Sequence, residues 1–408
     1  MKNYFTKAFR SSFLVLAIGL SVVSCKKNAI DNPEKPASQE NVDMHVVPGK
    51  YIVVLNDNAV PSLKNAATYE QSLENVINKA NQLLAASSTK SEVVFDNIYS
   101  TALKGFSANL SAEQVKTLKM SSDVISIEPD CQINLDSREM KPLSTKLPSS
   151  TTRADYWPWG IKFVGGAKYG DGRVAWVIDS GIDLDHPDLN VDQNRGRNFC
   201  SSYGYNATAD DDNGHGSHVA GTIAAKYNGI GVVGVAANAT VVPVKVVDYR
   251  GSGIASDCVK AVDYVAYSGK KGDVANMSLG YPTNSAIDRA VKNAASKGIK
   301  FAIAAGNERS NALYVTPARV VAPNVYKVCA IDSNGNWASF SNYGNVVDWA
   351  APGVGVWSTY KDGQYSKLDG TSMASPHIAG MLLVSGSLNT NGSVRCPYDS
   401  QSYPIAKH

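Results

Sequence analysis

The chain has 408 residues, with 39 basic and 36 acidic side chains and a formal net charge of only +3 at pH 7. This length allows two or three domains and a large core. The near balance of charge, without a basic block or an acidic tail, argues against nucleic acid as a partner. The six cysteines are spread out without the spacing of a zinc site.

Residues 1–24 have the composition of an export signal. Three basic residues precede the apolar stretch 13–23, which is too short to span a bilayer comfortably. The segment ends in Val22-Val-Ser-Cys25, which resembles the cleavage box of bacterial lipoproteins. That resemblance implies that Cys25 becomes the lipidated first residue of the mature chain. The alternative is an ordinary secretory signal with an incidental cysteine.

A polar tether with two prolines, 25–44, leads to a small α+β domain at 45–136. Its patterns predict strands at 50–55, 93–98, 105–110 and 124–130 and helices at 69–84 and 111–120. Ser111 and Gln114 predict a capping box. The order strand–helix–strand–strand–helix–strand is that of the ferredoxin-like fold.

Residues 137–155, rich in Ser, Thr, Lys and Pro, predict an exposed processing linker. The second and larger domain covers 156–408. Short apolar runs at 174–178, 240–247, 274–277, 300–305, 325–331 and 346–349 alternate with helical patterns at 215–225, 256–268 and 285–297. This alternation predicts an α/β fold with a doubly wound, mostly parallel sheet.

Three residues suited to acyl transfer each stand at the end of a predicted element. Asp179 follows the strand 174–178, and open α/β sheets form sites at the carboxyl ends of their strands. His215 stands between two glycines, which leave room for a substrate backbone. Ser372 precedes an apolar, buried helix whose free N–H groups and dipole favour an oxyanion. Pro376 is expected in the first turn of that helix, where a missing N–H does no harm.

A serine hydroxyl is a weak nucleophile until a base takes its proton, and a histidine of near-neutral pKa can do so. A buried carboxylate orients the imidazole and stabilises its cation. Each residue also has an ordinary explanation, Asp179 as a turn residue and Ser372 as a helix N-cap. His215 and His218 could instead hold a metal, although no HExxH glutamate and no third ligand are evident.

The motifs around these residues resemble the three signature blocks of the subtilisin-like serine proteases, in the proteinase K-like branch. The blocks are Asp-Ser-Gly-Ile182, His-Gly-Ser-His-Val-Ala-Gly-Thr222 and Gly-Thr-Ser-Met-Ala-Ser-Pro-His377, and the resemblance covers about 159–388. It implies a serine endopeptidase with Asp179, His215 and Ser372 as its triad. It also implies protein or peptide substrates, no cofactor for the chemistry and a monomeric state.

Further positions take their expected roles from the same resemblance. Ala-Ala-Gly-Asn307 is similar to the block whose asparagine forms the oxyanion hole, so Asn307 and the Ser372 N–H would be the two donors. Two extended walls would pair with the substrate backbone, beside a first pocket lined by small residues. These substrate-binding positions are Gly251, Ser252, Gly253, Ser278, Leu279, Gly280, Ala304, Ala305 and Gly306.

The first domain, 45–136, resembles the inhibitory propeptide of this family. The resemblance implies that it assists folding, blocks the cleft with its C-terminal tail and is cut off between Asp136 and Asp155. The expected protein is therefore an exported zymogen. Its location would be the cell envelope or outer membrane through the lipid anchor, or the outside of the cell after the propeptide is removed.

Cys329 and Cys396 resemble a bridged pair of the proteinase K-like branch, which leaves Cys200 and Cys258 to pair and Cys131 odd. Four cysteines allow three connectivities, and the sequence leaves all of them open. Asp348, which precedes Trp349-Ala-Ala-Pro352, resembles a calcium-binding aspartate of the same branch, so a structural calcium is a further expectation.

Two functions other than that of a protease are the alternatives. One is a non-enzymatic binding protein with this fold, held inhibited by a propeptide that is never released. The other is a nucleotide-binding α/β enzyme, but no GxGxxG or P-loop follows a predicted strand.

Overall fold

The computed structural model describes residues 45–60, 68–88, 92–136, 139, 141–147, 155–203 and 207–408. All of these belong to one compact unit, Pro36–His408. The predicted signal 1–24 and tether 25–44, and with them Cys25, lie outside the described residues, as does part of the predicted linker 137–155. Within the described ranges, no helix has both the length and the apolar character needed to cross a membrane.

The first domain has the predicted ferredoxin-like order of elements. They are β1 (His45–Leu55), α1 (Tyr69–Leu84), β2 (Phe95–Tyr99), β3 (Lys104–Asn109), α2 (Ala112–Lys119) and β4 (Val124–Asn134), with a short 3-10 helix at Asp57–Ala59. The strands pair antiparallel in the order β4-β1-β3-β2. The predicted capping box is present, because the side chains of Ser111 and Gln114 each accept from the backbone N–H of the other.

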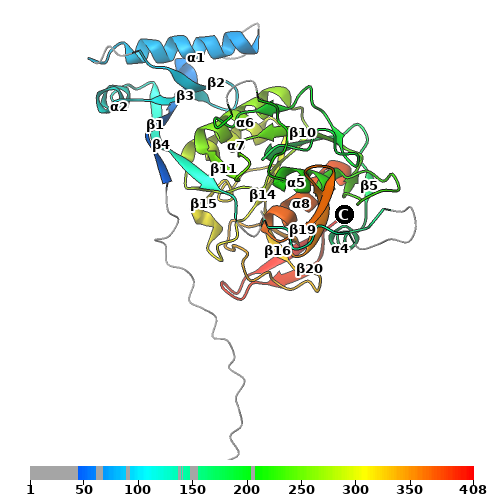
Figure 1. The fold of residues 1–408 in the computed structure, drawn as a ribbon. Coiled ribbons are helices and arrows are strands. Elements are labelled where there is room, and N and C mark those ends of the chain that lie inside the picture. Colours follow the sequence, from blue (N-terminus) through cyan, green and yellow to red (C-terminus); the bar gives the residue numbers. More distant parts are fainter. Residues whose placement is uncertain are drawn as a thin grey trace, which may run out of the picture. The chain divides into compact units, whose positions relative to one another are not determined.

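The two faces of this sheet have different partners. On β1, Val53 and Leu55 pack with side chains of α1 and α2, whereas Ile52 and Val54 belong to the core shared with α6 and α7. This is the alternation expected of a strand that is covered on both faces. Figure 1 shows α1 and α2 on the side of this sheet away from α6 and α7. The first domain thus sits on two helices of the second.

The second domain begins with short elements and then winds around a long sheet. Its helices are α4 (Trp159–Phe163), α5 (His215–Ala224), α6 (Ala255–Ser268), α7 (Ser285–Ser296) and α8 (Thr371–Ser385), with a 3-10 turn at Ala312–Tyr314. The strands of the main sheet are β6 (Val174–Asp179), β7 (Asn190–Val191), β8 (Arg197–Asn198), β10 (Thr240–Lys245), β12 (Val274–Met277), β14 (Lys300–Ala304), β16 (Val325–Ile331), β17 (Trp349–Pro352), β20 (Asn389–Arg395) and β21 (Ser402–Lys407).

The main sheet has the order β20-β21-β17-β16-β14-β12-β6-β10-β7, and its pairs are parallel except for the hairpin β20–β21. Side chains on one face pack with α6 and α7, and those on the other with α5 and α8. On β6, Trp176 and Ile178 face the first pair of helices, and Ala175 and Val177 face the second. The predicted doubly wound parallel sheet is therefore confirmed.

The remaining strands form small sheets and one inter-domain pair. They are β5 (Lys168–Tyr169) with β9 (Ala236–Ala237), β13 (Tyr281–Pro282) with β15 (Val315–Thr316), β18 (Val356–Tyr360) with β19 (Gln364–Leu368), and β11 (Ser252–Ile254) with β4. Strand β11 therefore extends the sheet of the first domain.

Two elements differ from their predictions in ways that matter for the site. Strand β4 does not end at residue 130 but continues to Asn134, because its last residues find a partner in β11. Helix α8 already begins at Thr371, so Pro376 lies inside the helix and not in its first turn. Smaller shifts affect the strand predicted at 346–349, which is found at Trp349–Pro352.

Candidate active site

The predicted acid and base meet in the structure. Asp179 is the last residue of β6, and His215 is the first residue of α5. Asp179 Oδ1 and His215 Nδ1 are 2.7 Å apart, and both side chains are fully buried. This leaves Nε2 of His215 as the nitrogen that is available for proton transfer.

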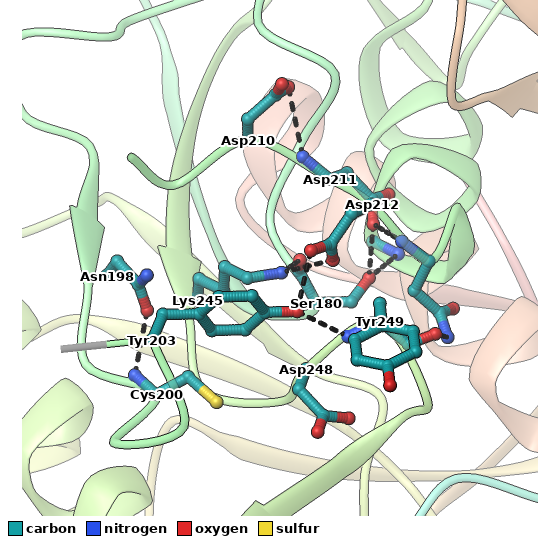
Figure 2. Close-up of polar contacts among 12 residues, drawn as sticks. Ser180, Asn198, Cys200, Tyr203, Asp210, Asp211, Asp212, Lys245, Asp248 and Tyr249 are labelled. Carbon is teal, nitrogen blue, oxygen red and sulfur yellow. Dashed lines mark hydrogen bonds and ion pairs between the residues drawn. The ribbon is translucent and has the colours of Figure 1, made fainter. Parts of the chain in front are cut away.

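A buried carboxylate ties together the two turns that carry this pair. Asp211 Oδ1 accepts from Ser180 Oγ at 2.8 Å (Figure 2). The same oxygen accepts from the Gly214 N–H at 2.8 Å, and Oδ2 accepts from the Ser217 N–H at 2.8 Å. Ser180 Oγ in turn accepts from the Gly216 N–H at 2.9 Å. A network of this kind fixes the position of both turns, since every one of its groups is buried and costly to leave unpaired.

Ser372 is the second residue of α8, and two hydrogen bonds join it to Ser278. Ser372 Oγ donates to Ser278 O at 3.2 Å, and Ser278 Oγ donates to Ser372 O at 2.9 Å. The second bond has a clear cause. Pro376 has no N–H for the carbonyl four residues earlier, which is that of Ser372, and the Ser278 hydroxyl takes its place.

Asn307 has its amide oriented by the start of the same helix. Its Oδ1 accepts from the Thr371 N–H at 2.8 Å and from Thr371 Oγ1 at 3.0 Å. The Nδ2 group therefore points away from Thr371 and donates at 2.7 Å to Glu139 Oε1. An amide held in this way is suited to donate to an oxyanion.

The acceptor in that bond, Glu139, occupies the centre of the site. Its side chain is 3% exposed, and its Oε2 lies 3.7 Å from His215 Nε2. A Cβ atom at Gly370 would strike Glu139, so only glycine leaves room for this side chain. Nothing in the sequence pattern pointed to Glu139.

The charges around His215 set its protonation. Burial by itself lowers the pKa of His215, but the carboxylates of Asp179 and Glu139 outweigh this and raise it to about 9. Burial also raises the pKa of Glu139, an effect that His215 opposes. His218 behaves differently, because burial lowers its pKa to about 3 and its Nε2 is bonded to Val356 O. The two histidines thus have separate partners, and the described residues hold no cluster of three His, Cys, Asp or Glu side chains fit for a metal.

The tail of the first domain lies along a predicted substrate wall. Ser252, Gly253 and Ile254 of β11 pair antiparallel with the end of β4, and the Leu135 N–H continues the ladder with a 2.8 Å bond to Gly251 O. Beside this tail is a cavity of about 260 Å³. Among its lining residues are Leu135, Leu279, Gly280, Ala304, Gly306, Asn307 and Ser372. Ala305 is fully buried, with its N–H bonded to Val328 O.

Three carboxylates that the sequence reasoning missed hold the two domains together. Asp130 accepts from the N–H and the hydroxyl of Ser256 at the start of α6. Glu128 accepts from the N–H of Ser285 at the start of α7. Asp263 of α6 accepts from three successive N–H groups, those of residues 100–102. The first two are acidic side chains at helix N-termini, where the dipole favours negative charge.

Neither predicted disulfide is formed in the structure, which has Cys131, Cys200, Cys258, Cys329 and Cys396 as buried free thiols. Local backbone groups engage the first predicted pair: Cys329 Sγ donates to Trp349 O, and Cys396 Sγ accepts from the Tyr398 N–H.

The contacts of Asp348 also argue against the calcium site expected there. Asp348 Oδ2 lies 2.8 Å from Nζ of the buried Lys327 and accepts from the Lys327 N–H at 2.9 Å. This carboxylate already has a cation beside it, so the residues present do not fit a calcium ion there.

Comparison with known proteins identifies both domains. The model of the Subtilase family matches residues 170–396, more than half of the chain, and that of Peptidase inhibitor I9 matches residues 50–136. The chain is 38% identical over 310 residues to an alkaline protease of Alkalihalobacillus alcalophilus, covering 74% of each protein. It is 30% identical over 399 residues to Proteinase R of Parengyodontium album, covering 95% of this chain and 93% of that protein.

A solved structure agrees with these relatives. The crystal structure of a cold adapted subtilisin-like serine proteinase matches with a TM-score of 0.53 and 33% identity, covering 67% of this chain and 98% of that one. The first domain is therefore an inhibitor I9 propeptide that precedes a catalytic domain. The chain belongs to the subtilase family and is a serine endopeptidase made with its propeptide inhibitor.

Proposed function

We propose that this protein is a self-cleaving zymogen in which Asp179, His215 and Ser372 hydrolyse peptide bonds and Asn307 stabilises the oxyanion. The observation that carries the proposal is the 2.7 Å contact of Asp179 with His215, in a site that also holds Ser372 and the Asn307 amide. The carboxylate of Glu139 accepts from Asn307 and lies 3.7 Å from His215 Nε2, which supports an inhibited precursor.

In the active enzyme, Glu139 has left the site and a substrate carbonyl takes its place. His215 Nε2 accepts the proton of Ser372 Oγ as this oxygen attacks the carbonyl carbon, and Asp179 stabilises the resulting imidazolium. Asn307 Nδ2 donates to the oxygen that becomes negative. His215 then gives its proton to the leaving amine, and a water molecule, activated by the same histidine, releases the acyl group from Ser372.

Protein and peptide substrates are proposed to bind as the propeptide tail does. Pairing with β11 uses main-chain groups, so it is compatible with many substrate sequences. The neighbouring pocket would bind one substrate side chain and so select among substrates. The small residues Ala304 and Gly306 leave room for a sizeable apolar or aromatic group in this pocket.

The test is self-processing during folding. Wild type should give two fragments, and Ser372→Ala should remain a single full-length chain. N-terminal sequencing of the larger fragment should place the cut between Asp136 and Asp155. A wild-type chain that stays intact and does not react with a fluorophosphonate probe would support the rival function, a binding protein with a permanently inhibited site.

Export and anchoring complete the proposal. The basic and apolar start of the chain supports export, and the Val22-Val-Ser-Cys25 box supports lipidation of Cys25 at the cell envelope or outer membrane. Metabolic labelling with a fatty acid should mark wild type and not Cys25→Ser, while both remain exported. Labelling of both would disprove the anchor, and intracellular retention of wild type would disprove export.

A further inference from the structure

A chain of hydrogen bonds connects the loop before β11 with the turn that carries Asp179 (Figure 2). It begins at the backbone N–H of Tyr249, which donates to Tyr203 Oη at 2.7 Å. The Tyr203 hydroxyl then donates to Asp212 Oδ2 at 2.6 Å. A hydroxyl that both accepts and donates in this way has one preferred position, since it can satisfy both partners only there.

Lys245 continues this chain to the catalytic turn. It is the last residue of β10 and stands opposite Asp179 in the parallel register with β6. Its ammonium group donates to Asp212 Oδ1 at 2.9 Å and to Ser180 O at 2.5 Å. Lys245 is only 1% exposed, so its ammonium group depends on these two acceptors, of which the Asp212 side chain is itself 44% exposed. Movement of Asp212 is therefore expected to move Lys245, and with it the carbonyl of Ser180, the residue that follows Asp179.

The loop before β11 is held at a second point. Asn213 Nδ2 donates to Tyr249 O at 3.1 Å, so both backbone polar groups of Tyr249 are bonded to side chains outside its own loop. The next link leads into the strand, where Asp248 Oδ1 accepts from the Ser252 N–H at 2.9 Å. The position of the substrate-pairing strand thus depends on the segment just before His215.

We propose that Tyr203 is a positioning residue, whose hydroxyl couples the substrate-pairing strand β11 to the Asp179–His215 pair through Asp212 and Lys245. Tyr203 itself touches neither the substrate path nor the reacting atoms. Its hydroxyl should therefore matter for substrates that are long enough to pair with β11. Substrates that do not reach β11 should react equally well without it. The inference rests on the proposed roles of Asp179 and His215.

The experiment compares Tyr203→Phe with wild type in the mature, processed enzyme. This variant keeps the ring, which lies 5.1 Å from Lys245 Nζ, and removes only the hydroxyl. For a tetrapeptide anilide we expect kcat/KM to fall about fivefold, the effect of one hydrogen bond. For an ester of a single amino acid we expect no change. Tyr227→Phe, at an exposed tyrosine whose ring packs on Trp157, is the matched control and should change neither rate.

The outcomes distinguish a failure of the Tyr203 coupling from a failure of the proposed triad. Equal losses on both substrates, or no loss on either, would overturn the coupling. A wild-type chain that neither processes itself nor turns over either substrate would overturn the proposed triad instead. If Tyr203→Phe does not fold, Asp212→Asn gives the same comparison, since Lys245 and Tyr203 donate to different oxygens of Asp212 and the amide keeps only one of them. Asp212→Asn should show the same dependence on substrate length. If its rates do not depend on substrate length, the proposal is wrong.

Discussion

Asn307 Nδ2 donates a 2.7 Å hydrogen bond to Glu139 Oε1, so the proposed oxyanion donor is occupied by a side chain of the chain itself. The backbone N–H of Glu139 is bonded to Asp136 O, so this side chain is tied to the end of the propeptide tail. Glu139 therefore places a carboxylate where the tetrahedral intermediate would place its negative oxygen. A carboxylate at this position should delay the first cleavage, because a substrate carbonyl cannot enter until it leaves.

The first prediction concerns the rate of self-processing. Glu139→Ala should shorten the half-time of the first cleavage, because the donor and the base become free. Stopped refolding samples analysed on denaturing gels give this half-time. Glu92→Gln, at an exposed glutamate of the propeptide, is the control and should process like wild type. Slower cleavage in Glu139→Ala would mean that this carboxylate assists processing.

A second prediction concerns the pKa of His215, which Asp179 and Glu139 together raise to about 9. In the Ser372→Ala precursor, the further change Glu139→Gln removes one of these charges, so the pKa of His215 should fall. The histidine ring signals in an NMR titration report it directly. An unchanged pKa of His215 would show that the charge of Glu139 does not act on this histidine.

The direction of this shift has a consequence for activity. Protonated His215 cannot accept the Ser372 proton, so the rate should rise as the pH rises through the pKa of His215. In the proposed mechanism Glu139 leaves the site on processing, so the acidic limb of the mature enzyme should lie below the pKa of about 9 that Asp179 and Glu139 give His215 in the precursor. Profiles of kcat/KM against pH measure this limb.

A third prediction tests Asn307 as an oxyanion donor. In subtilisin, loss of the corresponding donor lowers kcat by about 10²–10³, and we expect at least that order here. Asn307→Asp is the sharpest variant. It keeps an oxygen for the two bonds from Thr371 and replaces the N–H donor by a negative group. KM and the thermal midpoint should change little. A large loss of stability with normal kcat would make Asn307 a purely structural residue.

Much of the fold could be predicted because its elements have strong local patterns. The helix predicted at 69–84 coincides with α1, and the strands predicted at 274–277 and 325–331 coincide with β12 and β16. The end of β4 could not be predicted in the same way. Residues 133 and 134 extend the strand because β11, about 120 positions later, pairs with them. Pairing at such a distance leaves no local pattern.

The residues of the site also divide into those that a local motif reveals and those that it does not. Asp179 and His215 stand in motifs whose Gly-rich turns are visible in the sequence, and the structure brings them together. Glu139 meets its partners His215 and Asn307 from a distant part of the chain, and Asp211 is the middle one of three successive aspartates, so no spacing in the sequence singles out either carboxylate. Lys245 was counted as part of a strand, and its burial beside Asp212 depends on the neighbouring loop that carries Tyr203.

A last prediction concerns the hydroxyl of Ser278, which satisfies the Ser372 carbonyl that Pro376 leaves without a donor. In the Ser372→Ala precursor, which cannot digest itself, Ser278→Ala should lower the thermal midpoint by a few degrees, because a buried carbonyl loses its partner. Adding Pro376→Ala supplies the missing N–H to the same carbonyl and should restore part of the loss. Rescue fails if the Ser278 hydroxyl acts mainly through Asn276, which donates to it at 2.9 Å. The size of the recovery therefore measures how far this hydroxyl replaces a helical hydrogen bond at the residue proposed as the nucleophile.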